Sequence, residues 1–216
     1  MECVLCGSRR VTHFAHVHAR DYLACPTCDL VFMAPEYRLD SEAEKARYVL
    51  HENDPTDARY RAFLNRLAQP LMERLPPGAR GLDYGAGPGP TLSVMFEEQG
   101  FPMEIYDPFF APDRSVLERR YDFITCTEAA EHFYSPAKEF ARFDAMLKPG
   151  GWLGIMTETL TDPAHFADWW YVLEPSHVCF YRTSTFEWIA ARFGWHLEMP
   201  RRQVALFRKV ALKSSP

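Results

Sequence analysis

The sequence predicts an α/β fold, in which helices cover both faces of a largely parallel sheet and a small cysteine-rich segment precedes the sheet. Stretches typical of strands and of helices alternate from residue 79 to residue 193, which is the pattern of parallel strands joined by helices. A glycine-rich loop over residues 85–89 joins the first of these strands to a helix. Two Cys-x-x-Cys pairs lie upstream, within the first 28 residues.

The cysteine-rich segment comes first in the chain. Cys3 and Cys6 form one pair, Cys25 and Cys28 form the other, and 18 residues separate the pairs. Two such pairs complete the tetrahedral thiolate site that is typical of structural zinc, so the segment is interpreted as a zinc knuckle. Buried or redox-active thiols are the alternative, but the equal spacing of the pairs favours zinc. Three histidines between the pairs are substitute ligands or surface residues: His13, His16 and His18.

The remaining elements follow in order along the chain. Residues 1–34 are expected to form the knuckle, residues 35–75 linking helices, and residues 76–216 the sheet domain, with a hydrophobic core separate from that of the knuckle. Strands are expected over residues 11–14, 30–33, 79–84, 102–106, 121–127, 152–157, 195–199 and 204–210, the last two as an antiparallel pair at one edge. Helices are expected over residues 41–50, 56–75, 91–99, 136–147 and 184–193. Ser184 and Glu187 have the spacing of a capping box.

Composition restricts the classes of protein. A chain of 216 residues with 47% hydrophobic and 25% charged residues predicts one packed α/β domain and a small appendage. The net charge of −5 argues against general affinity for nucleic acid. No apolar run approaches the roughly 18 residues that cross a bilayer, and the N-terminus lacks a targeting pattern. We therefore expect a cytoplasmic protein that does not bind membranes; the sequence does not indicate its oligomeric state.

The glycine-rich loop is the central motif. It reads Asp83-Tyr84-Gly85-Ala86-Gly87-Pro88-Gly89, and its glycines allow a tight turn that brings a ligand close to the backbone. Asp107 ends the next expected strand, where a carboxylate can accept hydrogen bonds from both hydroxyls of a ribose. These residues alone fit a dinucleotide as well as other nucleoside cofactors.

Three motifs together resemble the class I methyltransferases that use S-adenosylmethionine (SAM). The loop resembles their motif I, and Glu128-Ala129-Ala130-Glu131-His132 and Leu147-Lys148-Pro149-Gly150-Gly151 are similar to later signatures of the superfamily. The resemblance implies a Rossmann-like sheet, SAM as cofactor and Asp107 on its ribose. The residues that it assigns to cofactor binding, mostly at the amino-acid end, are Asp83, Gly85, Ala86, Gly87, Gly89 and Thr127. Only 13 residues separate Asp107 from Tyr121, which is too few for the usual helix and third strand.

A second group of residues suits the chemistry of the acceptor. If residues 128–132 form a helical turn, then Glu128, Glu131 and His132 share one face. His177 follows the aromatic segment Trp169-Trp170-Tyr171, which is well placed to line the active site. The group resembles the divalent-metal site of small-RNA 2′-O-methyltransferases, and its first part resembles that of ubiquinone-pathway O-methyltransferases. It therefore implies either a divalent cation or a histidine base, with His132 and His177 facing each other, while a purely structural role for Glu131 and His132 is the alternative.

The sequence thus predicts a SAM-dependent methyltransferase that acts on a small-molecule oxygen or carbon acceptor. Two alternatives stay open. One is an RNA methyltransferase guided by the knuckle, and the other is an interaction protein with a vestigial cofactor fold. The complete glycine loop and Asp107 argue against the second alternative.

Overall fold

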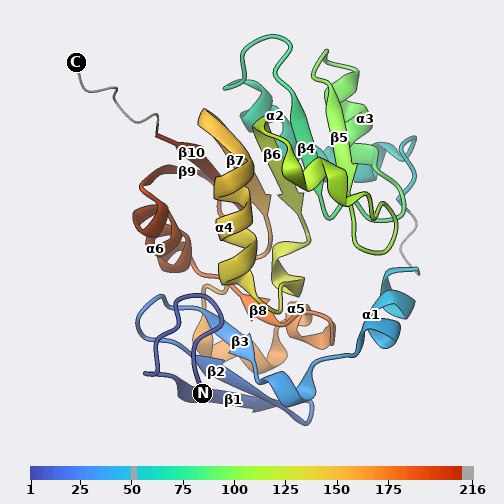
Figure 1. The fold of residues 1–216 in the computed structure, drawn as a ribbon. Coiled ribbons are helices and arrows are strands. Elements are labelled where there is room, and N and C mark those ends of the chain that lie inside the picture. The colour runs from blue at the N-terminus through green and yellow to red at the C-terminus, as the bar shows by residue number, and fades with distance from the viewer. Residues whose placement is uncertain (50–52, 211–216) are drawn as a thin grey trace, which may run out of the picture.

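The computed structural model describes residues 1–49 and 53–210. Its larger sheet has the strand order β5-β4-β6-β7-β10-β9 (Figure 1). β4 pairs in parallel with β5 and β6, and β6 with β7, whereas β10 is antiparallel to both neighbours. The predicted mostly parallel, Rossmann-like sheet is confirmed. Its strands are β4 (Gly81–Tyr84), β5 (Met103–Tyr106), β6 (Tyr121–Thr127), β7 (Leu147–Met156), β9 (Trp195–Arg201) and β10 (Val204–Lys209).

Helices cover both faces of this sheet. Alternate side chains of a strand point to opposite faces, so Phe123 packs in a cluster with α2 and α3 while its neighbour Ile124 packs in the cluster that includes α4 and α6. Figure 1 shows α4 crossing one face of the sheet and α1 at the right of the view, apart from the smaller sheet. The helices are α1 (Ser41–Tyr48), α2 (Ala58–Met72), α3 (Thr91–Glu97), α4 (Pro136–Met146), α5 (Trp170–Leu173) and α6 (Thr183–Phe193). Residue 50, expected at the end of the helix over 41–50, lies outside the described residues.

The cysteine-rich segment forms a second, antiparallel sheet with the order β1-β2-β3-β8. Two of its strands were expected, and β2 was not. Its last strand, β8, comes from far along the chain and pairs with β3 through Phe32 and Cys179. The strands are β1 (Thr12–Val17), β2 (Arg20–Ala24), β3 (Val31–Met33) and β8 (Cys179–Phe180).

The expectation of two separate hydrophobic cores is wrong. A single cluster joins Leu5 and Phe32 of the N-terminal segment to Phe166 and Phe180 of the later chain. The reason is the small sheet itself, since its apolar face has no partner within residues 1–34 and is covered by the segment that supplies β8. The exact division of the chain into domains stays a prediction.

Two local expectations have different outcomes. The capping box at Ser184 and Glu187 is wrong, because α6 begins one residue earlier, and the N–H of Arg182 donates to Thr185 Oγ1 at 3.1 Å. Ser184 instead donates to Asp29. The shortened stretch before β6 is confirmed, since it holds only a 3₁₀ turn over Arg114–Glu118 and leaves β5 at the sheet edge.

Within the described residues, no helix is long and apolar enough to cross a membrane.

Candidate active site

The glycine-rich loop lines a cavity of about 740 Å³ at the C-terminal ends of β4, β5 and β6. Gly85 has a φ of +83° and Gly87 a φ of +67°, a conformation that favours glycine. The N–H groups of Gly85 and Ala86 both donate to the carbonyl oxygen of Tyr106, at 2.8 and 3.2 Å. The loop is therefore fixed against the end of the neighbouring strand.

Close approach of other segments also explains the glycines. A Cβ atom at Gly85 would lie 2.6 Å from the Cβ of Ala129, and one at Gly89 would lie 2.0 Å from the carbonyl oxygen of Asn53. The chain just before α2 thus passes directly over the loop. These glycines are needed for internal packing as well as for the approach of a ligand.

Asp107 follows β5, and its carboxylate already holds the surrounding backbone. Oδ1 accepts from the N–H groups of Phe109 and Phe110 at 2.8 and 3.0 Å, and Oδ2 accepts from Gly87 N–H at 3.0 Å. An ionised carboxylate offers about four lone-pair positions. Within the described residues, one position on Oδ2 is left for a ligand, so this conformation offers one direct bond to a ribose rather than the two expected.

Asp83 lies at the end of β4 and is 3% exposed. Its Oδ1 accepts a hydrogen bond from the Thr125 hydroxyl at 2.8 Å. Burial, with a further contribution from the Asp107 charge, raises the pKa of Asp83 to about 7. The protonated and ionised forms are therefore both populated near neutral pH, and a cation placed beside this carboxyl would favour the ionised form.

Glu131, His132 and His177 meet on another side of the same cavity. One potential ligand atom from each lies within 4.8 Å of the others, and the two imidazole centroids are 4.8 Å apart. The predicted meeting of the two histidines is confirmed, because one follows β6 and the other follows β7, and these strands are neighbours in the sheet. Their chemical role stays a prediction.

Main-chain carbonyl groups fix the tautomers of both histidines. His132 Nδ1 lies 3.0 Å from the carbonyl oxygen of Ser176, and His177 Nδ1 lies 2.8 Å from that of Tyr171. A carbonyl oxygen only accepts, so in the neutral rings Nδ1 carries the hydrogen and Nε2 a lone pair. Burial lowers the pKa of His177 to about 4, so its ring is neutral at pH 7.

The Glu131 carboxylate is completely buried, and within the described residues only one of its two oxygens has a hydrogen bond. Oε2 accepts from the Thr157 hydroxyl at 2.8 Å. Oε1 lies 3.9 Å from His132 Nε2, and no atom of the described chain gives it a hydrogen bond. A buried carboxylate oxygen in this state is costly, which indicates a position where a ligand binds.

Glu128 does not join this group, contrary to the expected helical turn. The turn is a 3₁₀ helix over Ala130–His132, and Glu128 precedes it with a φ of +47°. Burial and the Glu131 charge raise the pKa of Glu128 to about 9, so it is protonated at neutral pH. Its Oε2 lies 3.4 Å from the Tyr171 hydroxyl oxygen. Glu128 still lines the cavity.

The sequence did not reveal the residues that α1 contributes. The Tyr48 ring packs edge-on against the His132 ring, with centroids 5.1 Å apart, and lies 5.7 Å from Phe109. Arg47 pairs with both carboxylate oxygens of Glu174. The run of helix-forming residues over 41–50 indicated the helix, but no local motif indicates a contact between residues 84 positions apart.

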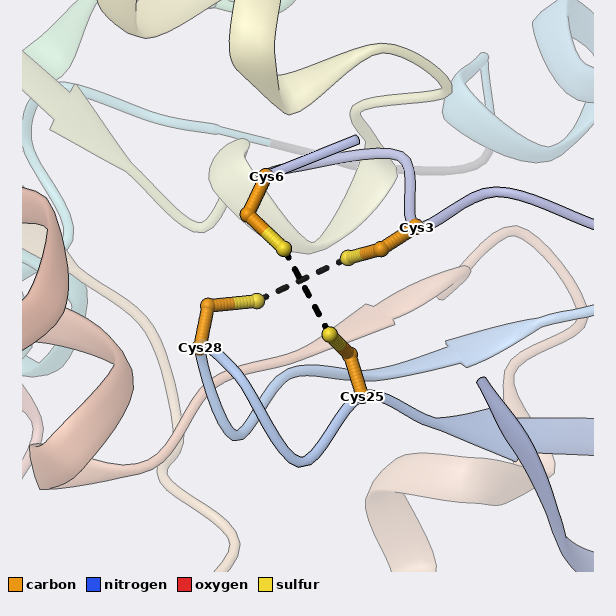
Figure 2. A group of neighbouring side chains, drawn as sticks. All are labelled: Cys3, Cys6, Cys25 and Cys28. Carbon is orange, nitrogen blue, oxygen red and sulfur yellow. Dashed lines mark hydrogen bonds between the residues drawn. The ribbon is translucent and has the colours of Figure 1, made fainter. Parts of the chain in front are cut away.

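The four paired cysteines converge at the start of the chain, and Figure 2 shows their side chains pointing toward one another. Cys3 Sγ lies 3.5 Å from Cys28 Sγ, and Cys6 Sγ lies 3.4 Å from Cys25 Sγ. The ligand set expected for zinc is therefore brought together, although the metal itself stays a prediction. The histidines between the pairs lie elsewhere, and His13 and His16 contact Asp21.

Comparison with known proteins decides the family. A profile of the methyltransferase domain matches residues 50–198. The chain belongs to this methyltransferase family. A search of curated protein sequences finds no match.

Solved methyltransferases share the fold at low identity. The chain is similar to 1,6-didemethyltoxoflavin-N1-methyltransferase of Burkholderia thailandensis, with a TM-score of 0.54, 16% identity, and coverage of 92% of this chain and 99% of that one. It is also similar to magnesium protoporphyrin IX methyltransferase of Synechocystis PCC 6803, with a TM-score of 0.52, 11% identity, and coverage of 81% and 97%. The chain is similar as well to an O-methyltransferase family protein of Burkholderia thailandensis, with a TM-score of 0.50 and 21% identity. The match covers 79% of this chain and 64% of that one, so this methyltransferase spans less than two thirds of that chain.

Proposed function

We propose that this methyltransferase transfers the methyl group of SAM to an oxygen or carbon atom of a small-molecule acceptor. One observation carries the proposal. The glycine loop with Asp107 and the cluster of Glu131, His132 and His177 line a single cavity, so that a cofactor at the first would face an acceptor at the second.

The cofactor side of the cavity fits SAM. Asp107 would bind the ribose through Oδ2, and Asp83, the glycine loop and Thr127 would bind the amino-acid end. Two features support this assignment: a carboxyl beside the loop that can pair with an ammonium group, and a buried Thr127 hydroxyl that has no hydrogen-bond partner within the described residues. When bound, SAM supplies a methyl group on a good leaving group, so the protein must mainly position the acceptor and exclude water.

The acceptor side fits a divalent cation held by Glu131, His132 and His177. One carboxylate oxygen and two imidazole Nε2 atoms suit Mn²⁺, Mg²⁺ or a similar ion, which lowers the pKa of a bound hydroxyl. The unbonded Glu131 Oε1 supports this choice. The low pKa of His177, caused by its burial, makes it a weak base and a ready ligand. Glu128 serves instead as a protonated hydrogen-bond donor at the cavity wall.

The charge of the cavity favours a small acceptor over a nucleic acid. Among the described residues, seven carboxyl side chains line it against three cationic ones, and this excess of carboxyl groups disfavours phosphate groups even with Glu128 protonated. The carboxyl groups are Glu44, Asp83, Asp107, Glu128, Glu131, Glu139 and Glu174, and the cationic groups are Arg114, Lys138 and Arg142. The Burkholderia thailandensis 1,6-didemethyltoxoflavin-N1-methyltransferase, solved with 1,6-didemethyltoxoflavin and S-adenosylhomocysteine bound, is in line with this class of substrate.

The N-terminal cysteines are the proposed site of a second metal, a structural zinc ion. Cys3, Cys6, Cys25 and Cys28 would hold one structural zinc ion, because four thiolates in this arrangement leave no position open for a substrate. Metal analysis of protein purified without added zinc should find close to one equivalent.

Titration calorimetry tests the assignment of the cofactor. We expect SAM to bind and NAD not to bind. Asp107→Asn keeps the size of the side chain but removes a charge-assisted bond worth about 1.5–3 kcal/mol, so SAM affinity should fall at least about tenfold. Binding of NAD in place of SAM would contradict the proposed function, and salt-sensitive binding of RNA at micromolar concentration would contradict the small-molecule acceptor.

A further inference from the structure

Tyr171, in α5, contacts His177 of the acceptor-side cluster, and also Thr157 and Glu128 beside it. It is 1% exposed, and its hydroxyl lies 3.0 Å from Thr157 Oγ1 and 3.4 Å from Glu128 Oε2. Its carbonyl oxygen accepts from His177 Nδ1 at 2.8 Å, and its ring lies 4.1 Å from the His177 ring, centroid to centroid. One residue thus contacts Glu128 and His177 directly and reaches Glu131 through Thr157.

The number of hydrogens sets the direction of these bonds. Thr157 has one hydroxyl hydrogen, and it is donated to Glu131 Oε2. The Thr157 oxygen must therefore accept the Tyr171 hydroxyl hydrogen across the 3.0 Å contact. The Glu128 carboxyl oxygen lies 3.4 Å from the Tyr171 hydroxyl, which is a longer and weaker contact than the one to Thr157. Tyr171, Thr157 and Glu131 form a directed line of hydrogen bonds that ends on Oε2.

This line determines which oxygen of Glu131 faces the histidines. A carboxylate can rotate about its last bond and exchange its two oxygens, or turn away from a ligand. Because Oε2 is held by Thr157, Oε1 points toward His132 Nε2, 3.9 Å away. The same tyrosine holds the His177 ring from two sides, with its carbonyl group and with its own ring.

We propose that Tyr171 and Thr157 are positioning residues that hold Glu131 Oε1 and His177 Nε2 in place for a divalent cation. The inference rests on the proposed function, since it concerns the same acceptor site. Residues that orient metal ligands through hydrogen bonds typically change metal affinity by 10- to 100-fold when the bond is removed.

Binding of Mn²⁺, measured from the electron paramagnetic resonance signal of the unbound ion, tests the inference without an acceptor. Mn²⁺ prefers oxygen and imidazole ligands, so it reports on this site rather than on the four cysteines. We expect Tyr171→Phe and Thr157→Val each to weaken Mn²⁺ binding at least about tenfold. Thr157→Ser keeps the hydroxyl and should restore binding to within about threefold of the unmodified protein.

Tyr181→Phe is the matched control. Tyr181 is also fully buried, and its hydroxyl donates to the carbonyl oxygen of Ala130, next to Glu131 but not to its side chain. This variant should bind Mn²⁺ normally. SAM affinity, measured on the same samples, should change less than about twofold in Tyr171→Phe and Thr157→Val, because neither hydroxyl lies on the cofactor side.

The possible results separate the claims. Normal Mn²⁺ binding by Tyr171→Phe and Thr157→Val would overturn the inference and leave the proposed function intact. Unmodified protein that binds SAM but not Mn²⁺ would overturn the cation site and this inference with it. Protein that binds neither would overturn the proposed function as a whole. Equal losses of Mn²⁺ and SAM affinity would indicate a general structural role and would also overturn the inference.

Discussion

Asp83 links the burial of one side chain to the pH dependence of cofactor binding. Its carboxyl lies at the end of a central strand with one hydroxyl donor, and burial raises its pKa to about 7. A SAM ammonium group near this carboxyl would prefer the ionised form. Below the raised pKa the carboxyl is neutral and this attraction is lost, whereas above it the attraction is complete.

SAM affinity should therefore rise with pH through the neutral range. Between pH 5.5 and 7.0 the dissociation constant should fall by on the order of tenfold, which follows from the linkage between ionisation of Asp83 and binding. Titration calorimetry across this range measures the effect. Asp83→Asn is the control, and its affinity should be lower and nearly independent of pH. An equally steep pH dependence in Asp83→Asn would assign the effect to another group.

At the residue scale, motifs revealed part of the site and tertiary contacts formed the rest. Asp83, Asp107 and Glu131 were predicted because each ends or follows a strand within a short motif. Tyr171 and Thr157 were not predicted, because their hydrogen bonds join residues that share no spacing in the sequence.

At the scale of elements, α1 forms part of the cavity wall through Glu44 and Tyr48. None of its residues is buried, and it is attached through the Arg47–Glu174 ion pair and the packing of Tyr48 on His132 and Phe109. The alternation of strand-like and helix-like stretches predicted the long strands and helices. It missed β2, whose short sequence has no marked alternation, and β8, which has only two residues.

Replacing Arg47 with Ala should loosen α1 without destabilising the fold. Exposed ion pairs contribute at most about 1 kcal/mol, so the melting temperature should change by less than about 4 °C. Amide hydrogen exchange over residues 41–48 should become at least about fivefold faster, because local opening depends on few contacts. Arg59→Ala, in an exposed position of α2, is a suitable control. Unchanged exchange in Arg47→Ala would show that the ion pair does not hold the helix.

At the scale of the whole molecule, the N-terminal sheet supports the acceptor side of the cavity. Val178 N–H donates to the carbonyl oxygen of Glu131 at 2.8 Å, and the carbonyl oxygen of Val178 accepts from Met33 N–H, also at 2.8 Å. Val178 thus links the backbone of the cysteine-rich segment, at Met33, to the backbone of the site, at Glu131. The shared core of this segment with the later chain could not be predicted, because the partner strand lies about 150 residues away.

Loss of the N-terminal metal should therefore affect the whole fold. Cys25→Ser should unfold in one cooperative transition, with a midpoint lower by on the order of 10 °C, because structural zinc contributes several kcal/mol. Its Mn²⁺ affinity should fall more than its SAM affinity. Differential scanning calorimetry and metal analysis measure these effects. Two separate transitions, with the second unchanged in Cys25→Ser, would show that the two sheets are independent.

A crystal structure of the protein grown with S-adenosylhomocysteine and Mn²⁺ would show whether one cavity joins a SAM site to a cation-binding acceptor site. We predict density for the ribose at Asp107 Oδ2, the sulfur atom directed toward His132, and an anomalous signal for Mn²⁺ between Glu131, His132 and His177. Cofactor density in this cavity with its sulfur directed away from the histidines, or a Mn²⁺ signal only elsewhere, would contradict this arrangement of the two sites.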